Sequence, residues 1–308
     1  MPQTVRRPAV LLALVAVLGL GASAPWWLGA YWLGILTIGY YFGVFAMSWD
    51  LLFGYAGEVN FGPTFLIGVG AYAAGLLNNA GVPLPACVVL GGLAAVVGGL
   101  ILAIPALRLH GPYFGLVTLV AVLLLLDFIV IFAAQTGGEI GMMVPDVLSV
   151  STNVNYWYAF VFVAISAAIL FLLSRSALGL ILQATGQDRI EAAALGFNVT
   201  KHKLAAFAVS ALFSGLAGAM LTFYEGTASV DQMVDLSIAV QIIIAVVFGG
   251  RRTILGGVLG ALFLVLFNEL LRPLGQLNTF VVSAIALVVI LFLPDGVLGW
   301  VLRPRVGR

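Results

Sequence analysis

Residues 112–133 read PYFGLVTLVAVLLLLDFIVIFA and hold one charged side chain, Asp127. A run of this length can cross the roughly 30 Å of bilayer hydrocarbon, which takes about 20 apolar residues in a helix. Lipid offers no partner for backbone hydrogen bonds, so a single spanning segment of this kind must be helical. Barrel strands would be about 10 residues long with alternating polarity. The stretch therefore predicts a membrane-spanning helix.

The rest of the chain has the same character. Of 308 residues, 63% are hydrophobic and only 8% are charged, whereas soluble domains carry about 25% charged residues. We therefore predict an all-α polytopic membrane protein of about ten transmembrane helices, forming one domain over residues 1–308. The predicted spans are 8–24, 31–52, 61–78, 83–105, 112–133, 155–173, 203–224, 236–250, 253–271 and 279–299.

The basic residues predict the orientation. With an inner N-terminus and alternating spans, twelve of the 13 Lys and Arg residues fall on the cytoplasmic side and only Arg272 falls outside. Such a bias follows the positive-inside rule. We expect a multi-pass protein of a bacterial cytoplasmic (inner) membrane with both termini inside. The first span resembles a secretory signal ending at Ala22–Ala24, but we expect a retained span.

A polar island, residues 175–203, interrupts the apolar runs. It holds six of the 25 charged residues and contains a short helix with its own boundaries. Asp188 is a suitable N-cap, Glu191 can close a capping box, and Gly196 can end the helix. Two turns are too short to persist alone in water. Its exposed alanines suggest a surface on which a partner docks. The alternative is an ordinary cytoplasmic loop.

Several chemistries are absent from the sequence. The two lysines follow no GxxxxG run, so there is no phosphate-binding P-loop. There is no HExxH motif, no Cys/His cluster and no GxSxG nucleophile motif. We therefore expect a non-enzymatic chain without a metal or cofactor of its own. Its role would be to move a solute or to serve as a scaffold for a protein that does.

Two features inside the spans are candidates for a translocation path. Asp127 is costly at mid-span, although it lies near enough to the outer end that it could reach water. Gln241 is a weaker polar candidate. The stretch Gly54–Pro63 cannot be a regular helix, because it holds three glycines and a proline in ten residues. Broken backbone at membrane depth occurs where it is buried or lines a cavity; the alternative is a plain loop.

Ten spans divide as five plus five, which predicts an inverted repeat. The third and eighth spans then correspond. The residues before them share a thin likeness, Tyr55-x-Gly57-x-x-Asn60 against Tyr224-x-Gly226-x-x-Ser229. If the likeness reflects a repeat, the two stretches enter from opposite sides and are expected to face one cavity.

Four stretches together resemble a known family. They are DLLFGYAGEVNFGPTFLIGVGAYAAGLL (50–77), LRLHGPYFGLVTL (107–119), TGGEIGM (136–142) and the long run from the polar island into VVFGGRRTILGGVLGA (174–261). The chain resembles the permease subunits of branched-chain amino-acid ABC importers, the second (M-type) subunit in particular. Urea-import permeases share the pattern.

The resemblance implies partners that composition does not. They are a second permease subunit in a heterodimer, two cytosolic ATPase subunits that bind ATP and Mg²⁺, and an extracytoplasmic solute-binding protein. The polar island matches the family's coupling helix, with Asp188, Arg189, Glu191, Ala192, Ala193 and Gly196 as ATPase-coupling residues. The residues expected to line or gate the solute path are Tyr55, Gly57, Glu58, Asn60, Gly62, Pro63, Asp127, Tyr224, Gly226, Ser229 and Gln241.

The chain also departs from the family pattern. Pro63 stands where histidine is frequent, Ile140 stands where asparagine is frequent, and Arg251–Arg252 replaces a small or apolar pair. The first two departures leave urea or a short amide as an alternative solute. A proton- or ion-coupled secondary transporter using Asp127 is the rival from another class, and a non-transporting membrane scaffold is a third reading.

Overall fold

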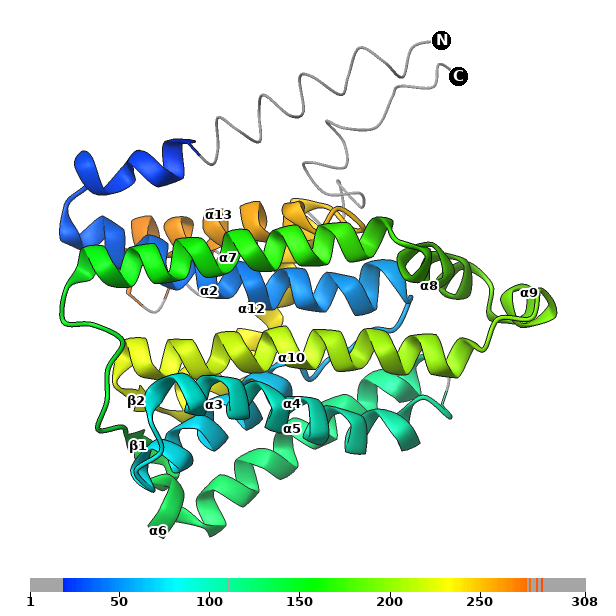
Figure 1. The fold of residues 1–308 in the computed structure, drawn as a ribbon, viewed down its shortest axis with the longest axis horizontal. Coiled ribbons are helices and arrows are strands. Elements are labelled where there is room, and N and C mark those ends of the chain that lie inside the picture. The colour runs from blue at the N-terminus through cyan, green and yellow to red at the C-terminus, as the bar shows by residue number, and fades with distance from the viewer. Residues whose placement is uncertain (1–18, 110, 276, 278–280, 282–283, 285–308) are drawn as a thin grey trace.

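A computed structural model describes residues 19–109 and 111–275, together with 277, 281 and 284. Its regular structure is helical apart from one pair of two-residue strands, and the long helices run side by side (Figure 1). The principal elements are α2 (Ala30–Asp50), η2 (Leu51–Tyr55), α3 (Pro63–Asn79), α4 (Leu84–Ala106), α5 (Pro112–Ile131), α6 (Ala133–Thr136), β1 (Met142–Met143), α7 (Thr152–Arg175), α8 (Ala177–Gln187), α9 (Arg189–Ala194), α10 (Val199–Glu225), β2 (Thr227–Ala228), α11 (Val230–Met233), α12 (Leu236–Gly249) and α13 (Leu255–Leu271). Short 3₁₀ turns lie at Ala24–Trp26, Gly138–Ile140 and Arg272–Leu274.

The prediction of an all-α polytopic membrane protein is confirmed. Within the described residues, six helices are long and apolar enough to cross a membrane, and α13 is a shorter apolar helix. Eight predicted spans, from 31–52 to 253–271, coincide with α2, α3, α4, α5, α7, α10, α12 and α13. Most of the first predicted span and almost all of the tenth, 279–299, lie outside the described residues.

The outward surfaces of α4, α5 and α7 are apolar. Large side chains on them are more than half exposed, among them Ile101, Leu124 and Ile165. In water such a surface would be a liability, whereas lipid is a suitable neighbour for it. The tightly packed interior lies between α2, α3, α10 and α12.

Helix packing has the symmetry expected of a five-plus-five inverted repeat. In that scheme α2 corresponds to α10, α3 to α12 and α4 to α13. α4 packs along α10 as α13 packs along α2, and α3 packs on α4 as α12 packs on α13. Each of the helices α2 and α3 also contacts its own counterpart, α10 and α12 respectively. Exchanging the halves therefore preserves these pairings, whereas the α2–α7 contact corresponds to one between α10 and the first predicted span, most of which lies outside the described residues.

Glycines allow the closest of these helix contacts. A Cβ built on Gly70 of α3 would lie 2.4 Å from the Cα of Gly215 on α10, whereas one on Gly98 of α4 meets nothing closer than 3.4 Å. Lipid is as apolar as the helix surfaces, so the hydrophobic effect does not drive membrane helices together. Close packing of this kind holds them together instead.

We expect Gly70→Ala to lower the thermal midpoint of the purified protein, because overpacking a tight core costs about 1–3 kcal/mol. Gly98→Ala is the matched control, a helical glycine that has room for the methyl group. The measurement is the temperature at which the detergent-solubilised protein loses its monodisperse peak. Equal midpoints for the two variants would contradict the packing argument.

The two ends of the bundle differ. α8 and α9 lie at one end, and β1, β2 and α6 lie at the other (Figure 1). The strands pair antiparallel, with Met142 opposite Ala228, and so join the loop after α6 to the end of α10. Among the described residues, the basic ones other than Arg272 lie in elements and loops at the α9 end. This separation is what the positive-inside prediction requires; the assignment of the α9 end to the cytoplasm stays a prediction.

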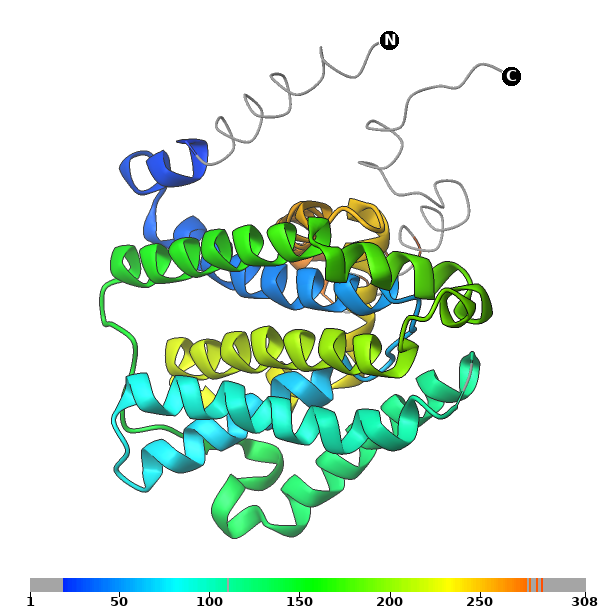
Figure 2. The same ribbon diagram turned by 45° about the vertical axis from the view of Figure 1, so that its right-hand side comes forward.

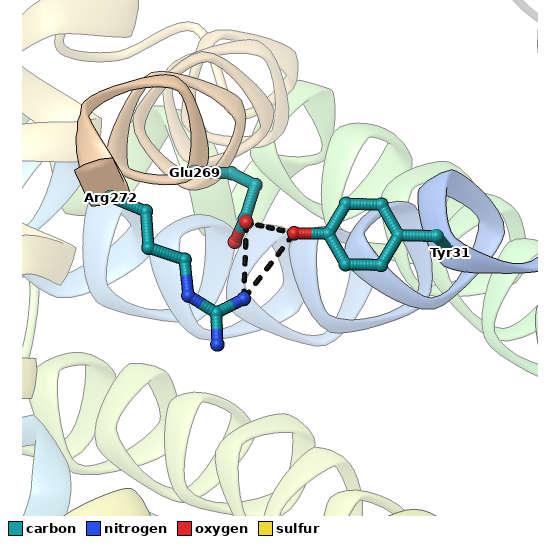
Figure 3. A network of polar contacts seen from close by, with 3 residues as sticks. All are labelled: Tyr31, Glu269 and Arg272. Atoms are coloured by element: carbon teal, nitrogen blue, oxygen red, sulfur yellow. Dashed lines mark hydrogen bonds and ion pairs between the residues drawn. The ribbon is translucent and has the colours of Figure 1, made fainter.

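Arg272, at the opposite end, has local acidic and hydroxyl partners. Its Nη1 donates to Glu269 Oε1 at 3.2 Å and to the Tyr31 hydroxyl at 3.3 Å, and that hydroxyl also hydrogen-bonds Glu269 (Figure 3). The cluster joins the start of α2 to the end of α13. The one basic residue predicted outside thus has a structural role there.

Candidate functional site

The break between α2 and α3 extends over residues 51–62, which we call the interrupted segment. It begins as a five-residue π-helical turn, Leu51–Tyr55, and turns at Gly57, whose φ of +72° suits glycine. Pro63, which has no N–H to donate, starts α3. The predicted irregular backbone is confirmed. Ala56, Asn60 and Gly62 are buried, whereas Gly57 and Phe61 are exposed, so the segment packs against the bundle with part of its chain at the surface.

The second half of the interrupted segment is fixed against α2 and α5. Trp49 Nε1 donates to the carbonyl of Asn60 at 2.6 Å, and the Asn60 side chain accepts from the N–H of Gly62 at 2.8 Å. The N–H of Phe61 donates to Thr118 Oγ1 on α5 at 3.0 Å. Asn60, Gly62 and Pro63, which were proposed for the path, therefore all have structural roles.

A buried carboxylate at the end of α2 holds the turn between α12 and α13. Asp50, which is fully buried, accepts hydrogen bonds from the N–H groups of Arg252 and Ile254, each at 3.1 Å. Both donors have positive φ, +61° and +52°, which is unusual for residues other than glycine. Asp50 is not among the residues predicted from the sequence to have a role. Its only signal in the sequence is its place at the end of an apolar run, which does not indicate the two N–H groups that it accepts from.

Further contacts join this turn to the interrupted segment. The Tyr55 hydroxyl donates to the carbonyl of Arg252 at 2.9 Å, and Arg252 Nε donates to the carbonyl of Gly54 at 2.7 Å. The guanidinium of Arg251 lies 4.1 Å from the ring centre of Phe53. The Arg251–Arg252 pair, a departure from the family pattern, is thus part of the contact between the two halves.

Glu58 is held in an ion pair rather than facing open space. Its Oε1 lies 2.5 Å from the Nζ of Lys203, the fifth residue of α10, with side-chain exposures of 13% and 8%. A pair so well removed from water needs both members, since either charge alone would be left uncompensated. The path residue Glu58 and the polar island are thereby brought together.

The short helix of the polar island, α9, has the predicted boundaries. Asp188 Oδ1 accepts from the N–H groups of Ile190 and Glu191, at 2.7 and 3.0 Å. At the other end Gly196 has φ +89°, its N–H donates to Ala193, and the N–H of Phe197 donates to Ala192. This pattern is a Schellman motif. In the predicted capping box, the Glu191 side chain would accept from the N–H of Asp188. In the structure that N–H donates to the carbonyl of Ala184 instead.

The exposed surface of α9 is not mainly alanine, so that expectation was wrong. Ala192 is buried at 2% exposure, while Ala193 and Ala194 are exposed. The large apolar side chains that face outward are Ile190 and Leu195, at 81% and 75% exposure. Ala192 turns inward because its position on this one-and-a-half-turn helix faces the bundle. The ribbon of α9 lies at one tip of the molecule (Figures 1 and 2), with the side chains of Ile190 and Leu195 exposed beside Glu191.

Tyr224, Gly226 and Ser229 lie at the far end from α9. Gly226, with φ +74°, ends α10 and accepts at its carbonyl from the N–H of Val144. Lys203, which binds Glu58, lies near the start of the same helix, and 23 positions separate it from Gly226, or about 34 Å at 1.5 Å each. The two similar stretches therefore lie at opposite ends of α10, as entry from opposite sides requires; that they face one cavity stays a prediction.

The remaining polar candidates lie apart from both stretches. Asp127 is on the exposed face of α5, among Leu123, Leu124 and Phe128. Gln241 of α12 accepts from Asn268 Nδ2 of α13 at 3.5 Å. Among the described residues, no three His, Cys, Asp or Glu side chains lie close enough to hold a metal ion.

Comparison with known proteins gives one family. A model described as "Branched-chain amino acid transport system / permease component" matches residues 31–294. The chain is 27% identical to the high-affinity branched-chain amino acid transport system permease protein LivM of Salmonella typhimurium, over 93% of this chain and 74% of the relative. LivM of Escherichia coli matches equally, at 27% over the same shares. The ribose import permease protein RbsC of Haemophilus influenzae is 31% identical over 42% of each chain. No solved structure matches the chain significantly.

Proposed function

The chain belongs to the family of branched-chain amino acid transport system permease components, and from this premise we propose that it imports branched-chain or related amino acids by alternating access. ATP hydrolysis in two cytosolic partner subunits drives the cycle, with Mg²⁺ and ATP bound there. The match over residues 31–294 carries the proposal. The named relatives LivM, which are branched-chain amino acid permeases, support the solute class.

The α9 end supplies the place where such ATPases dock. A short helix fixed at both ends exposes Ile190 and Leu195, and a partner surface that covers them would gain the free energy of burying their apolar area. Asp188 and Gly196 set its boundaries, and Arg189, Glu191, Ala192 and Ala193 lie between them. In this proposal α9 faces the bacterial cytoplasm.

The outward end receives the solute from an extracytoplasmic binding protein, and a second permease subunit completes the path. The apolar face of α5 around Asp127 is a suitable contact for that subunit, because an ionised carboxylate facing lipid costs about 2.5–3.5 kcal/mol at mid-span. Tyr55, Gly57 and Glu58 gate the path at the α9 end, and Tyr224, Gly226 and Ser229 at the other.

The direct test is reconstitution with co-expressed partner subunits. Proteoliposomes that hold the complex and the binding protein should take up radiolabelled leucine only with ATP in the compartment of the ATPases. Uptake of labelled urea in place of leucine would assign the alternative solute. Uptake driven by a proton or ion gradient without ATP would overturn the ABC assignment.

Asp127→Asn separates the two transporter classes by its effect on rate. We expect leucine uptake to fall less than about threefold, because no proton or ion needs to bind this carboxylate in an ATP-driven cycle. A proton-coupled carrier that uses Asp127 would lose nearly all uptake. Asp231→Asn, at an exposed acid beyond the spans, is the matched control for loss of one negative charge.

A further inference from the structure

The two chain segments that flank α9 each contact one of two neighbouring residues of the interrupted segment. Gly186 lies two positions before Asp188 and touches Gly57. Lys203 lies seven positions after Gly196 and binds Glu58. Residues 57 and 58 are neighbours, so α9 is attached to one point of the interrupted segment from both of its sides.

The first attachment is backbone against backbone. A Cβ on Gly57 would lie 2.9 Å from the Cα of Gly186, and one on Gly186 would lie 2.6 Å from the carbonyl oxygen of Tyr55. No side chain lies between the backbones at Gly57 and Gly186. A displacement of one backbone therefore cannot be absorbed by a change of side-chain rotamer. Close-packed contacts of this kind transmit movement rather than damping it.

The second attachment is the ion pair. Glu58 Oε1 and Lys203 Nζ are 2.5 Å apart and mostly shielded from water. Separating the two groups in this setting would leave a buried charge without a partner, which is strongly unfavourable. Lys203 and Glu58 are therefore expected to move together.

The same segment continues directly to α5. Three residues beyond Glu58, the N–H of Phe61 donates to Thr118 Oγ1 of α5. A Cβ on Gly62 would lie 2.1 Å from the carbonyl oxygen of Thr118, so here too the backbones are in close contact. Displacement of residues 57 and 58 thus has a short connection to the helix whose outer face carries Asp127.

We propose that Gly57 and Glu58 are the point at which movement of α9 enters the membrane bundle, with Gly186 and Lys203 as the positioning residues that deliver it. The interrupted segment passes the displacement to α5 through Phe61 and Gly62. This inference rests on the proposed function, because it takes α9 as the site on which the ATPases dock.

The test uses the complete complex with its ATPase subunits and binding protein in proteoliposomes. Leucine uptake and ATP hydrolysis are measured together for Glu58→Gln, Lys203→Gln and the charge-swapped double variant Glu58→Lys/Lys203→Glu. We expect each single change to lower leucine imported per ATP hydrolysed about three- to tenfold, and the swap to recover most of the loss. Lys201→Gln is the matched control, an exposed lysine two residues before Lys203 on the same helix, and should leave this ratio unchanged.

A second variant, Gly186→Ala, tests the backbone contact without altering charge. The added methyl group must displace residues 55–57, so we expect the same fall in leucine per ATP. All variants should still co-purify with the ATPases, because α9 itself is unchanged. Gly98→Ala serves as the control, because a methyl group on this helical glycine makes only ordinary contacts of 3.4 Å or more.

The outcomes separate the two levels of the argument. If the unaltered complex neither co-purifies with ATPases nor imports leucine, the proposed function fails and this inference fails with it. If it does both, and Glu58→Gln, Lys203→Gln and Gly186→Ala keep the unaltered ratio, only this inference is overturned. Loss in the single variants without recovery in the swap would also overturn it, since that result indicates local damage.

Discussion

Replacing Ile190 and Leu195 together by aspartate is expected to abolish assembly with the ATPase subunits and, with it, ATP-driven uptake. These are the large apolar side chains that α9 presents to solvent, at 81% and 75% exposure. Burying each in a partner groove is worth about 1.5–3 kcal/mol, so losing both weakens binding at least a hundredfold. The measurement is the amount of ATPase that co-purifies with the tagged permease.

The controls separate docking from folding. Neither side chain packs in the bundle, so the thermal midpoint of the isolated permease should not change. Ile140→Asp, at a residue 93% exposed at the opposite end, removes a comparable apolar side chain and should leave co-purification intact. Undiminished ATPase binding in the Ile190/Leu195 double variant would show that α9 is an ordinary loop.

Gly196→Val disturbs the same helix by another route. The left-handed φ of +89° strains any residue with a Cβ, and a β-branched one most, although open space surrounds the position. We expect weaker ATPase binding than in the unaltered protein, with a smaller effect than the double aspartate variant. Both changes act on docking rather than on the solute path.

Asp50→Leu is expected to cause the largest loss of stability of any single change considered for this chain. It removes the acceptor for the N–H groups of Arg252 and Ile254 in a site with no access to water. Each unsatisfied buried donor costs about 1–3 kcal/mol, which gives about 2–6 kcal/mol for the pair. The protein is expected to fold poorly and to lose its monodisperse peak at a much lower temperature.

Two related variants sharpen this prediction. Asp50→Asn keeps one acceptor oxygen and should lose about half as much, since one of the two N–H groups still has a partner. Asp127→Leu removes a carboxylate from an exposed position on α5, where it caps no backbone groups, and should leave the thermal midpoint unchanged or raise it. A similar loss for Asp50→Leu and Asp127→Leu would contradict the role given to Asp50.

Local features of the chain were predictable because their causes are local. Apolar runs of about 20 residues define the spans. The glycines and proline of residues 54–63 preclude a regular helix, and the structure has a π-helical turn and an irregular connection there. Asp188 and Gly196 mark the ends of α9 because capping depends on residues within one helical turn.

The contacts between distant residues could not be predicted in the same way. Glu58 and Lys203 are 145 positions apart, and Asp50 lies 202 and 204 positions from the N–H groups it accepts. No periodicity in the sequence relates residues at such separations. The inward turn of Ala192 and the structural roles of Asn60 and Gly62 likewise had no signal in the sequence.

The sequence by itself determined what kind of protein this is. It is a helical membrane domain with an irregular segment between its second and third predicted spans and a short capped helix outside the spans. Backbone hydrogen bonding in lipid and helix capping act within a few residues, so composition and spacing suffice to read them. Only the tertiary structure decided that the chain segments before and after α9 contact the interrupted segment at Gly57 and Glu58. That meeting depends on how α2, α8 and α10 pack, and packing is settled by the whole chain at once.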